Sequence, residues 1–278
     1  MSPLITVVTV VLNGEEFIEE TMLSVIQQSY QNIEYIIIDG GSIDTTPEII
    51  KKYKSEIAYY ISESDDGIYD AMNKGVRKAN GDWIVFMNAG DFFQGPEIIN
   101  TVVKNIKNIS DHVAIAYGGL SLISITGHPL LTIADREKVV LKKIRYKLPI
   151  PHQAQFIRLE LMHKVGLFNT KYRIAGDYDM TVRLLSNYRC RQLDGLVTAS
   201  MRVGGISADP ANSLQVLKED RQVQVDHNMP LKVTFILSVV RVYVRIFIWA
   251  VLGEQNGRKT LDVLNYIRGR RSYWAKTK

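Results

Sequence analysis

The stretch LITVVTVVLNGEEFIEETMLSVIQQSYQNIEYIIIDGG (residues 4–41) decides the fold class. It opens with a continuous apolar run at 4–12 that is rich in β-branched residues, the pattern of a strand covered on both faces. Residues 15–28 then carry apolar side chains at helical spacing, with acids in the first turn. A second apolar run follows at 33–39. A strand, a helix and a strand in this order predict a βαβ unit with parallel strands.

The same alternation continues through residue 107. Further strands are expected at residues 57–62 and 82–88, and helices at 46–54, 68–79 and 96–107. The pattern then loosens: we expect strands with a Thr-Gly turn over 112–133, a strand running into a helix over 151–166, a helix at 177–187 and a strand region at 191–205. The sequence therefore predicts an α/β fold with a mostly parallel sheet.

Composition narrows the class of protein. The chain has 278 residues, of which 46% are hydrophobic and 23% are charged, enough to build a sizeable core. One cysteine, Cys190, excludes a disulfide framework and a cysteine-built zinc site, and no two of the five histidines have metal-ligand spacing. The apolar N-terminal run has no basic segment before it, so we expect no secretory signal and a cytoplasmic location.

Polar residues follow the expected strands where each strand ends. These ends are residues 13–14, 39–42, 62–67 and 88–91, and three of the four carry acids. In open α/β sheets the ligand binds outside the carboxyl ends of the strands. The sequence therefore predicts a cleft that is rich in carboxylates.

Three short segments supply the candidate chemistry, each with a plain structural alternative. DGGSIDTT (39–46) offers Asp39 as an acceptor of ligand hydrogen bonds, or only a capped strand-to-helix turn. NAGD (88–91) offers Asp91 as a metal ligand with the amide oxygen of Asn88 beside it, or an ordinary loop. AGDYDM (175–180) offers a general base, or acids that only cap a helix.

These segments, in this order, resemble the family 2 glycosyltransferases, which have the GT-A fold. The similarity covers residues 4–210 and is nearest to bacterial enzymes of colanic acid, capsule and O-antigen synthesis. The motifs that carry it are TVVLN (9–13), DGGSIDTT (39–46), SESDDGIYDAMNKG (62–75), GDWIVFMNAGD (81–91) and AGDYD (175–179).

The resemblance implies a role for each matching residue. The implied donor-binding residues are Thr9, Asn13, Asp39, Asp65 and Asn88. Asp91 would hold Mg²⁺ or Mn²⁺ against the donor diphosphate, and Asp177 would be the catalytic base. His152 and Gln153 lie where such folds approach the acceptor, and the alternative for His152 is a structural histidine with its hydrogen bonds satisfied.

The implied reaction is one inverting displacement, which moves a sugar from a nucleotide sugar, by family a UDP-sugar, to a lipid-linked or glycan acceptor. Two features depart from the family pattern or leave a choice open. Metal motifs of the family often carry two or three acids, whereas Asn88 and Gly90 leave Asp91 alone here. Which of Asp65 and Asp66 faces the ligand rests on the resemblance only.

The last part of the chain differs in charge and hydropathy. We expect a GT-A domain over residues 1–228, with a donor half at 1–110 and an acceptor half at 111–228, and a basic tail at 229–278. Residues 230–278 carry ten Lys and Arg against two acids.

Residues 230–253 of this tail are apolar apart from one polar stripe, formed by Thr234, Ser238, Arg241 and Arg245. That pattern predicts a helix lying on the inner face of the cytoplasmic membrane with its arginines at the headgroups, assisted by Arg268, Arg270 and Arg271. Docking on the protein's own body or on a second copy of the chain is the alternative.

Other functions remain open at this stage. A nucleotidyltransferase that makes an activated sugar would carry a basic, glycine-rich loop after the first strand, whereas LNGEEF (12–17) is acidic. A nucleic-acid-binding protein could use the basic tail, but residues 233–252 are too apolar for a phosphate-binding surface. Because the metal motif has a single acid, a catalytically inactive scaffold protein is a further alternative.

Overall fold

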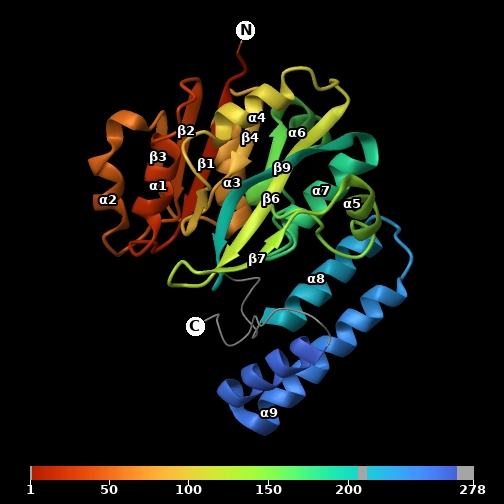
Figure 1. Cartoon of the computed structure of the whole chain (residues 1–278). Helices are drawn as coiled ribbons and strands as arrows, with labels where there is room; N and C mark the ends of the chain where they lie inside the picture. The colour runs from red at the N-terminus through yellow and green to blue at the C-terminus, as the bar shows by residue number, and fades with distance from the viewer. Residues whose placement is uncertain (1, 206–211, 268–278) are drawn as a thin grey trace.

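A nine-stranded mixed sheet organises the chain in the computed structural model, which describes residues 2–205 and 212–267 (Figure 1). The strand order is β3-β2-β1-β4-β8-β6-β9-β5, with β7 beside β6. The strands are β1 (Ile5–Val11), β2 (Ile33–Asp39), β3 (Tyr59–Ser62), β4 (Trp83–Phe86), β5 (Asp91–Phe93), β6 (Val113–Ile123), β7 (Pro129–Ile133), β8 (Gln155–Arg158) and β9 (Arg189–Arg202).

Helices connect these strands. They are α1 (Ile18–Ile26), α2 (Thr46–Lys52), α3 (Ile68–Lys78), α4 (Ile98–Ile106), α5 (Glu137–Lys143), α6 (Leu159–Val165), α7 (Gly176–Asn187), α8 (Ser213–Asp226) and α9 (Val233–Ile267), with short 3₁₀ turns η1 (Lys54–Glu56) and η2 (His152–Ala154). The expected α/β fold is confirmed. α5, α8 and the short strand β5 were not expected from the sequence.

The first four strands form the parallel part of the sheet. β1 pairs in parallel with β2 on one side and β4 on the other, and β2 pairs in parallel with β3. All seven residues of β1 are buried, as its continuous apolar run predicts. Beyond β4 the sheet is mixed, because β8 is antiparallel to both β4 and β6, whereas β9 is parallel to β6.

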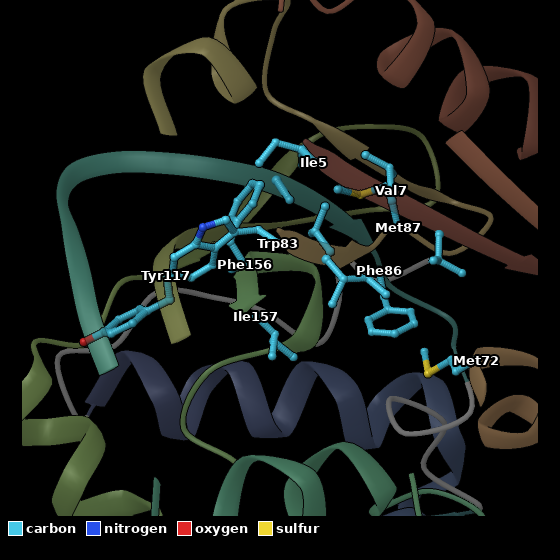
Figure 2. Packing of buried hydrophobic residues seen from close by; sticks show 14 of the residues in the cluster. Ile5, Val7, Met72, Trp83, Phe86, Met87, Tyr117, Phe156 and Ile157 are labelled. Atoms are coloured by element: carbon cyan, nitrogen blue, oxygen red, sulfur yellow. The ribbon is translucent and has the colours of Figure 1, made fainter. Parts of the chain in front are cut away.

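One hydrophobic core runs along the sheet. Figure 2 shows part of it, where Trp83 and Phe86 of β4 lie among side chains from β1, α3, β6 and β8. Phe86 and Phe156 are completely buried. This core holds the carboxyl ends of β1 and β4 side by side, and the polar residues that follow each strand therefore come together.

The C-terminal helix α9 is a hairpin of two segments. The chain turns at Gly253, whose φ of 72° favours glycine, and the second segment packs so closely on the first that a Cβ on Gly257 would lie 2.3 Å from the Trp249 ring. Figure 1 shows this hairpin beside α8 and apart from the sheet. Arg245 donates to Ser213 of α8 and stacks on Trp249, so it does not point outward as expected.

Candidate functional site

A cavity of about 790 Å³ opens at the carboxyl ends of β1 and β4. Its walls also come from the N-terminus of α7, from η2, from the end of β9 and from α8. Six of the residues singled out from the sequence line it, namely Asn13, Asn88, Asp91, His152, Gln153 and Asp177. The structure therefore joins segments as far apart as residues 13 and 177 in one cleft, where the strand-end argument places a ligand site.

Asp91 is the buried carboxylate of this cavity. It is 5% exposed at the start of β5, and Gln153 donates from Nε2 to its Oδ2 over 2.9 Å. Burial raises the pKa of Asp91 to about 6, although the nearby His152 and the hydrogen bond from Gln153 act in the opposite direction. The position strongly favours a cationic partner for this carboxylate.

Two amide oxygens beside Asp91 are buried without a hydrogen-bond partner. They are Oδ1 of Asn88 and Oε1 of Gln153. A buried polar atom without a hydrogen bond lowers the stability of the folded state, because its lost hydration is not replaced. Mg²⁺ and Mn²⁺ prefer oxygen ligands, so the donor set fits a hard divalent cation. No cluster of three or more acidic, His or Cys side chains that could hold a metal occurs in the described ranges. A cation here would therefore need oxygens from a bound phosphate or water as well.

Asp177 is the second residue of α7 and lies on another wall of the cavity. Its Oδ1 accepts a hydrogen bond from the backbone N–H of Tyr178 over 2.8 Å. Its Oδ2 lies 3.2 Å from Nδ1 of His152. The carboxylate is thus oriented on both oxygens, and its side chain remains 14% exposed to the cavity. Such a group can accept a proton from a bound hydroxyl.

His152 connects the two ends of the site. The amide Nδ2 of Asn88 lies 3.1 Å from Nε2 of His152, and this amide nitrogen can only donate. The neutral ring must then carry its proton on Nδ1, from which it donates to Asp177. From the sequence His152 was either an acceptor-side residue or a structural histidine; in the structure both ring nitrogens have a partner, and the ring lies between Asn88 and Asp177.

Two residues that sequence reasoning missed hold the segment before Asp177. The carboxylate of Glu219 accepts hydrogen bonds from the backbone N–H groups of Ile174 and Ala175, at 2.7 and 3.0 Å. The hydroxyl of Tyr69 donates to the Ile174 carbonyl. A Cβ on Gly176 would lie 2.7 Å from the Tyr69 ring, which explains the glycine in AGDYD. No local pattern could reveal contacts across 45 and 105 residues of sequence.

Thr9 does not line the cavity. Its side chain is completely buried inside the sheet, where its hydroxyl donates to the Met87 carbonyl and lies 3.0 Å from the Tyr35 hydroxyl. The expectation that Thr9 lines the nucleotide pocket does not agree with this structure. The reason is its depth in the strand: Val10 and Val11 at the carboxyl end of β1 line the cavity, whereas Thr9 lies further inside, against Tyr35 and Met87.

Asp39 also lies behind the cavity wall. It is completely buried, and its carboxylate accepts hydrogen bonds from Ser62 and from the backbone and hydroxyl of Ser42. Ser42 in turn accepts from the backbone N–H of Asn13, which does line the cavity. In this conformation Asp39 therefore supports the site through the loop that it holds, rather than by facing the cleft.

Asp65 lies beside that loop, outside the cavity lining. Its Oδ1 accepts from the backbone N–H of Gly67 over 2.9 Å, and a Cβ on Gly40 would lie 2.5 Å from its Oδ2. Glycine at position 40 thus permits the close approach of this carboxylate. Asp66 is exposed, so of the two acids it is Asp65 that faces inward.

A second group of charged residues, which sequence reasoning also missed, lines the far end of the cavity. It consists of Lys147, Arg173 and Asp220, the last from α8. Burial and the nearby Asp177 raise the pKa of Asp220 to about 7, although Lys147 lowers it. These residues come from three separate segments, and only the folded chain shows that they share a surface.

Comparisons with known proteins agree with this geometry. The family model described as glycosyl transferase family 2 matches residues 6–119. An uncharacterised glycosyltransferase of Mycobacterium tuberculosis is 31% identical over 188 residues, which cover 66% of this chain and 69% of that protein. A PGL/p-HBAD biosynthesis glycosyltransferase of Mycobacterium bovis is 27% identical over 213 residues, covering 74% and 80%.

Solved structures show the same fold at low sequence identity. A mannosyltransferase from Pyrobaculum calidifontis, in complex with GDP-Man and Mn²⁺, has a TM-score of 0.65 at 16% identity and covers 100% of this chain and 84% of its own. TarS of S. aureus, in complex with UDP-GlcNAc, has a TM-score of 0.59 at 15% identity and covers 96% and 87%. The architecture is the GT-A fold.

Proposed function

This chain belongs to glycosyltransferase family 2, and from that membership we propose that it transfers a sugar from a UDP-sugar to a lipid-linked or glycan acceptor in surface polysaccharide synthesis. The family makes it an inverting, nucleotide-sugar-dependent transferase. One observation carries the proposal: Asp91 and Asp177 lie on the walls of one cavity, with His152 between them.

The proposed mechanism follows from this arrangement. Asp177 takes the proton of an acceptor hydroxyl as that oxygen attacks the anomeric carbon. His152 holds the carboxylate in place and keeps its own proton on Nδ1. The bond between the anomeric carbon and the diphosphate breaks on the opposite face of the sugar, so a single displacement inverts the configuration.

Asp91 would hold the divalent cation, with the oxygens of Asn88 and Gln153 nearby. When bound, Mg²⁺ or Mn²⁺ supplies positive charge against the departing diphosphate. Asn13 places the β1 loop at the donor side of the cavity, and Asp39 and Asp65 lie behind that loop. We propose that the nucleoside binds along this loop.

The biological setting is proposed from the resemblance and from the relatives. Similar proteins include glycosyltransferases named for PGL/p-HBAD biosynthesis, so the capsule and O-antigen setting is one choice within glycoconjugate synthesis. The reduced metal motif does not favour an inactive scaffold, because the remaining carboxylate is buried and two amide oxygens in the same part of the site have no hydrogen-bond partner.

A donor panel tests the proposed function. We expect UDP-sugars to raise the melting temperature by about 5 °C at saturating concentration, and only with Mg²⁺ or Mn²⁺ present. The assay compares UDP-sugars with GDP-Man, with each cation and with a chelator, and donor hydrolysis is followed in the same samples. The proposal would be contradicted if no nucleotide sugar raised the melting temperature and the protein hydrolysed none of them.

We also propose that α9 attaches the protein to the inner face of the cytoplasmic membrane. The segment Val233–Gly253 has a mean hydropathy of 2.1 and is 6% buried. Its exposed apolar side chains recur at helical spacing along one stripe, formed by Val233, Ile236, Leu237, Val240, Tyr243, Val244, Phe247 and Val251. Because Arg245 faces α8, it is this apolar stripe that points away from the protein. Arg268, Arg270 and Arg271 lie outside the described residues.

Vesicle flotation tests this attachment. We expect the triple variant Val244→Glu, Phe247→Glu, Val251→Glu to lose at least tenfold in binding to vesicles that contain phosphatidylglycerol, because three exposed apolar side chains become anionic. Leu131→Glu, on an exposed residue of β7, is the matched control and should float like the wild type. Equal flotation of the triple variant and the wild type would show that lipid does not cover this stripe.

A further inference from the structure

The cavity end beside α8 carries two exposed basic side chains that form no salt bridge with another described residue. Lys147 and Arg173 both line the cavity, and neither forms an ion pair or a side-chain hydrogen bond with another residue that the structure describes. Other basic side chains near the site are paired, as Arg183 is with Asp179 and Arg202 with Glu20. Two unpaired cations on the wall of a cleft form a site for an anion.

The charges divide the cavity into two ends. At one end Asp91 lies against η2, where Gln153 donates to its carboxylate over 2.9 Å. At the other end Lys147 follows Tyr146, whose carbonyl accepts from Gln224 of α8, the helix that also carries Asp220. Lys147 therefore belongs to the α8 end of the cavity, whereas Asp91 would meet the donor diphosphate at the η2 end. An anion at Lys147 would thus lie on the acceptor side of the catalytic base.

We propose that Lys147 and Arg173 bind an anionic group on the acceptor, a phosphate or a carboxylate, while Asp220 receives a sugar hydroxyl beside the one that Asp177 deprotonates. This inference rests on the proposed function and names the class of its acceptor. A guanidinium can bind either oxyanion through two parallel hydrogen bonds, and an ammonium adds a point charge.

The surroundings of Lys147 favour an acceptor that approaches the cavity from the side on which α9 lies. Partial desolvation and the neighbouring Lys143 and Arg241 lower the pKa of Lys147, whereas Asp135 and Asp220 raise it. α8 lines this end of the cavity, and its Ser213 accepts a hydrogen bond from Arg245 of α9, so this end lies beside the helix with the exposed apolar stripe. A lipid phosphate and a uronic acid share the required chemistry, and the experiment separates them.

Calorimetric titration of the full chain tests the inference. The probes are hexyl phosphate, hexyl glucuronide and the neutral hexyl glucoside, each added with the donor end saturated by Mg²⁺ and the nucleoside diphosphate that the donor panel identifies. We expect one anionic probe to bind at least tenfold more tightly than the glucoside. Lys147→Gln or Arg173→Gln should weaken that binding by about 10- to 100-fold and leave the glucoside unchanged. Lys138→Gln, an exposed lysine of α5 outside the cavity lining, is the matched control.

The possible outcomes separate this inference from the proposed function. Tighter binding of hexyl phosphate supports a phosphate-bearing acceptor, and tighter binding of the glucuronide supports a uronic acid. Equal binding of all three probes, or variants that bind the anions as the wild type does, would overturn the inference. Weaker nucleotide binding by Lys147→Gln or Arg173→Gln would also overturn it, because the cations would then serve the donor. Failure of every nucleotide to bind the wild type would instead count against the proposed function.

Discussion

Replacing Asp177 with asparagine is expected to lower kcat for sugar transfer by about 10³-fold, with the fold and donor binding retained. Asparagine has nearly the same shape and keeps an oxygen that can accept from Tyr178 N–H. It cannot take the proton of the acceptor hydroxyl, so the loss falls on the chemical step. Single-turnover transfer with a saturating donor measures it, and donor-induced thermal shifts show whether donor binding is intact.

Asp179 provides a matched control two residues away on the same helix. It is 4% exposed, and its carboxylate binds Arg183 at 2.9 Å and lies 2.8 Å from Nε2 of His227. Asp179→Asn should therefore lower the melting temperature, while the folded fraction keeps much of its activity. From the residues alone, the acids at the start of this helix can be caps or a general base, and the resemblance assigns the base to Asp177; of the two, Asp177 lines the cavity and Asp179 does not. Near-normal turnover by Asp177→Asn would remove Asp177 from the role of base.

The sequence predicted the first half of the fold well because each element there has one strong local signal. The apolar runs of β1, β2 and β4 are strands buried on both faces, and their patterns depend little on distant contacts. β5 was missed because its three residues follow a polar turn and pair only with β9, which is about 110 residues later. The turn of α9 at Gly253 likewise depends on packing between Trp249 and Gly257.

The candidate site could likewise be predicted where it is built from the ends of strands, but not where it is built from later helices. Asn13, Asn88 and Asp91 follow strands that the sequence reveals, and the topology of an open sheet then brings them together. Thr9 was misplaced because a motif identifies the strand but does not settle how far along it the cavity reaches, and in β1 the lining begins at Val10. Glu219 and Asp220 could not be found, since they reach the site from a helix that carries no motif.

Asp91→Asn should abolish cation-dependent donor binding and lower transfer by at least about 100-fold, because asparagine offers a neutral oxygen where the cation needs a carboxylate. The measurement is the donor-induced thermal shift, titrated with Mn²⁺. Glu97→Gln is a suitable control, because Glu97 is an exposed acid outside the cavity lining. A variant at position 91 that keeps the full Mn²⁺-dependent shift would show that the cation binds elsewhere.

The same substitution should raise stability when no cation is present. Burial raises the pKa of Asp91 from 3.8 to about 6, so the folded state binds more protons than the unfolded state between those pH values. The wild type therefore loses stability as the pH rises from about 4 to 6, and Asp91→Asn does not share that loss. The variant should be more stable by roughly 1–3 kcal/mol above pH 6, with little difference below pH 4. A residue whose replacement stabilises the fold and removes donor binding is one that the chain retains for its ligand. Lower stability of the variant at pH 8 would instead indicate a structural role for the carboxylate.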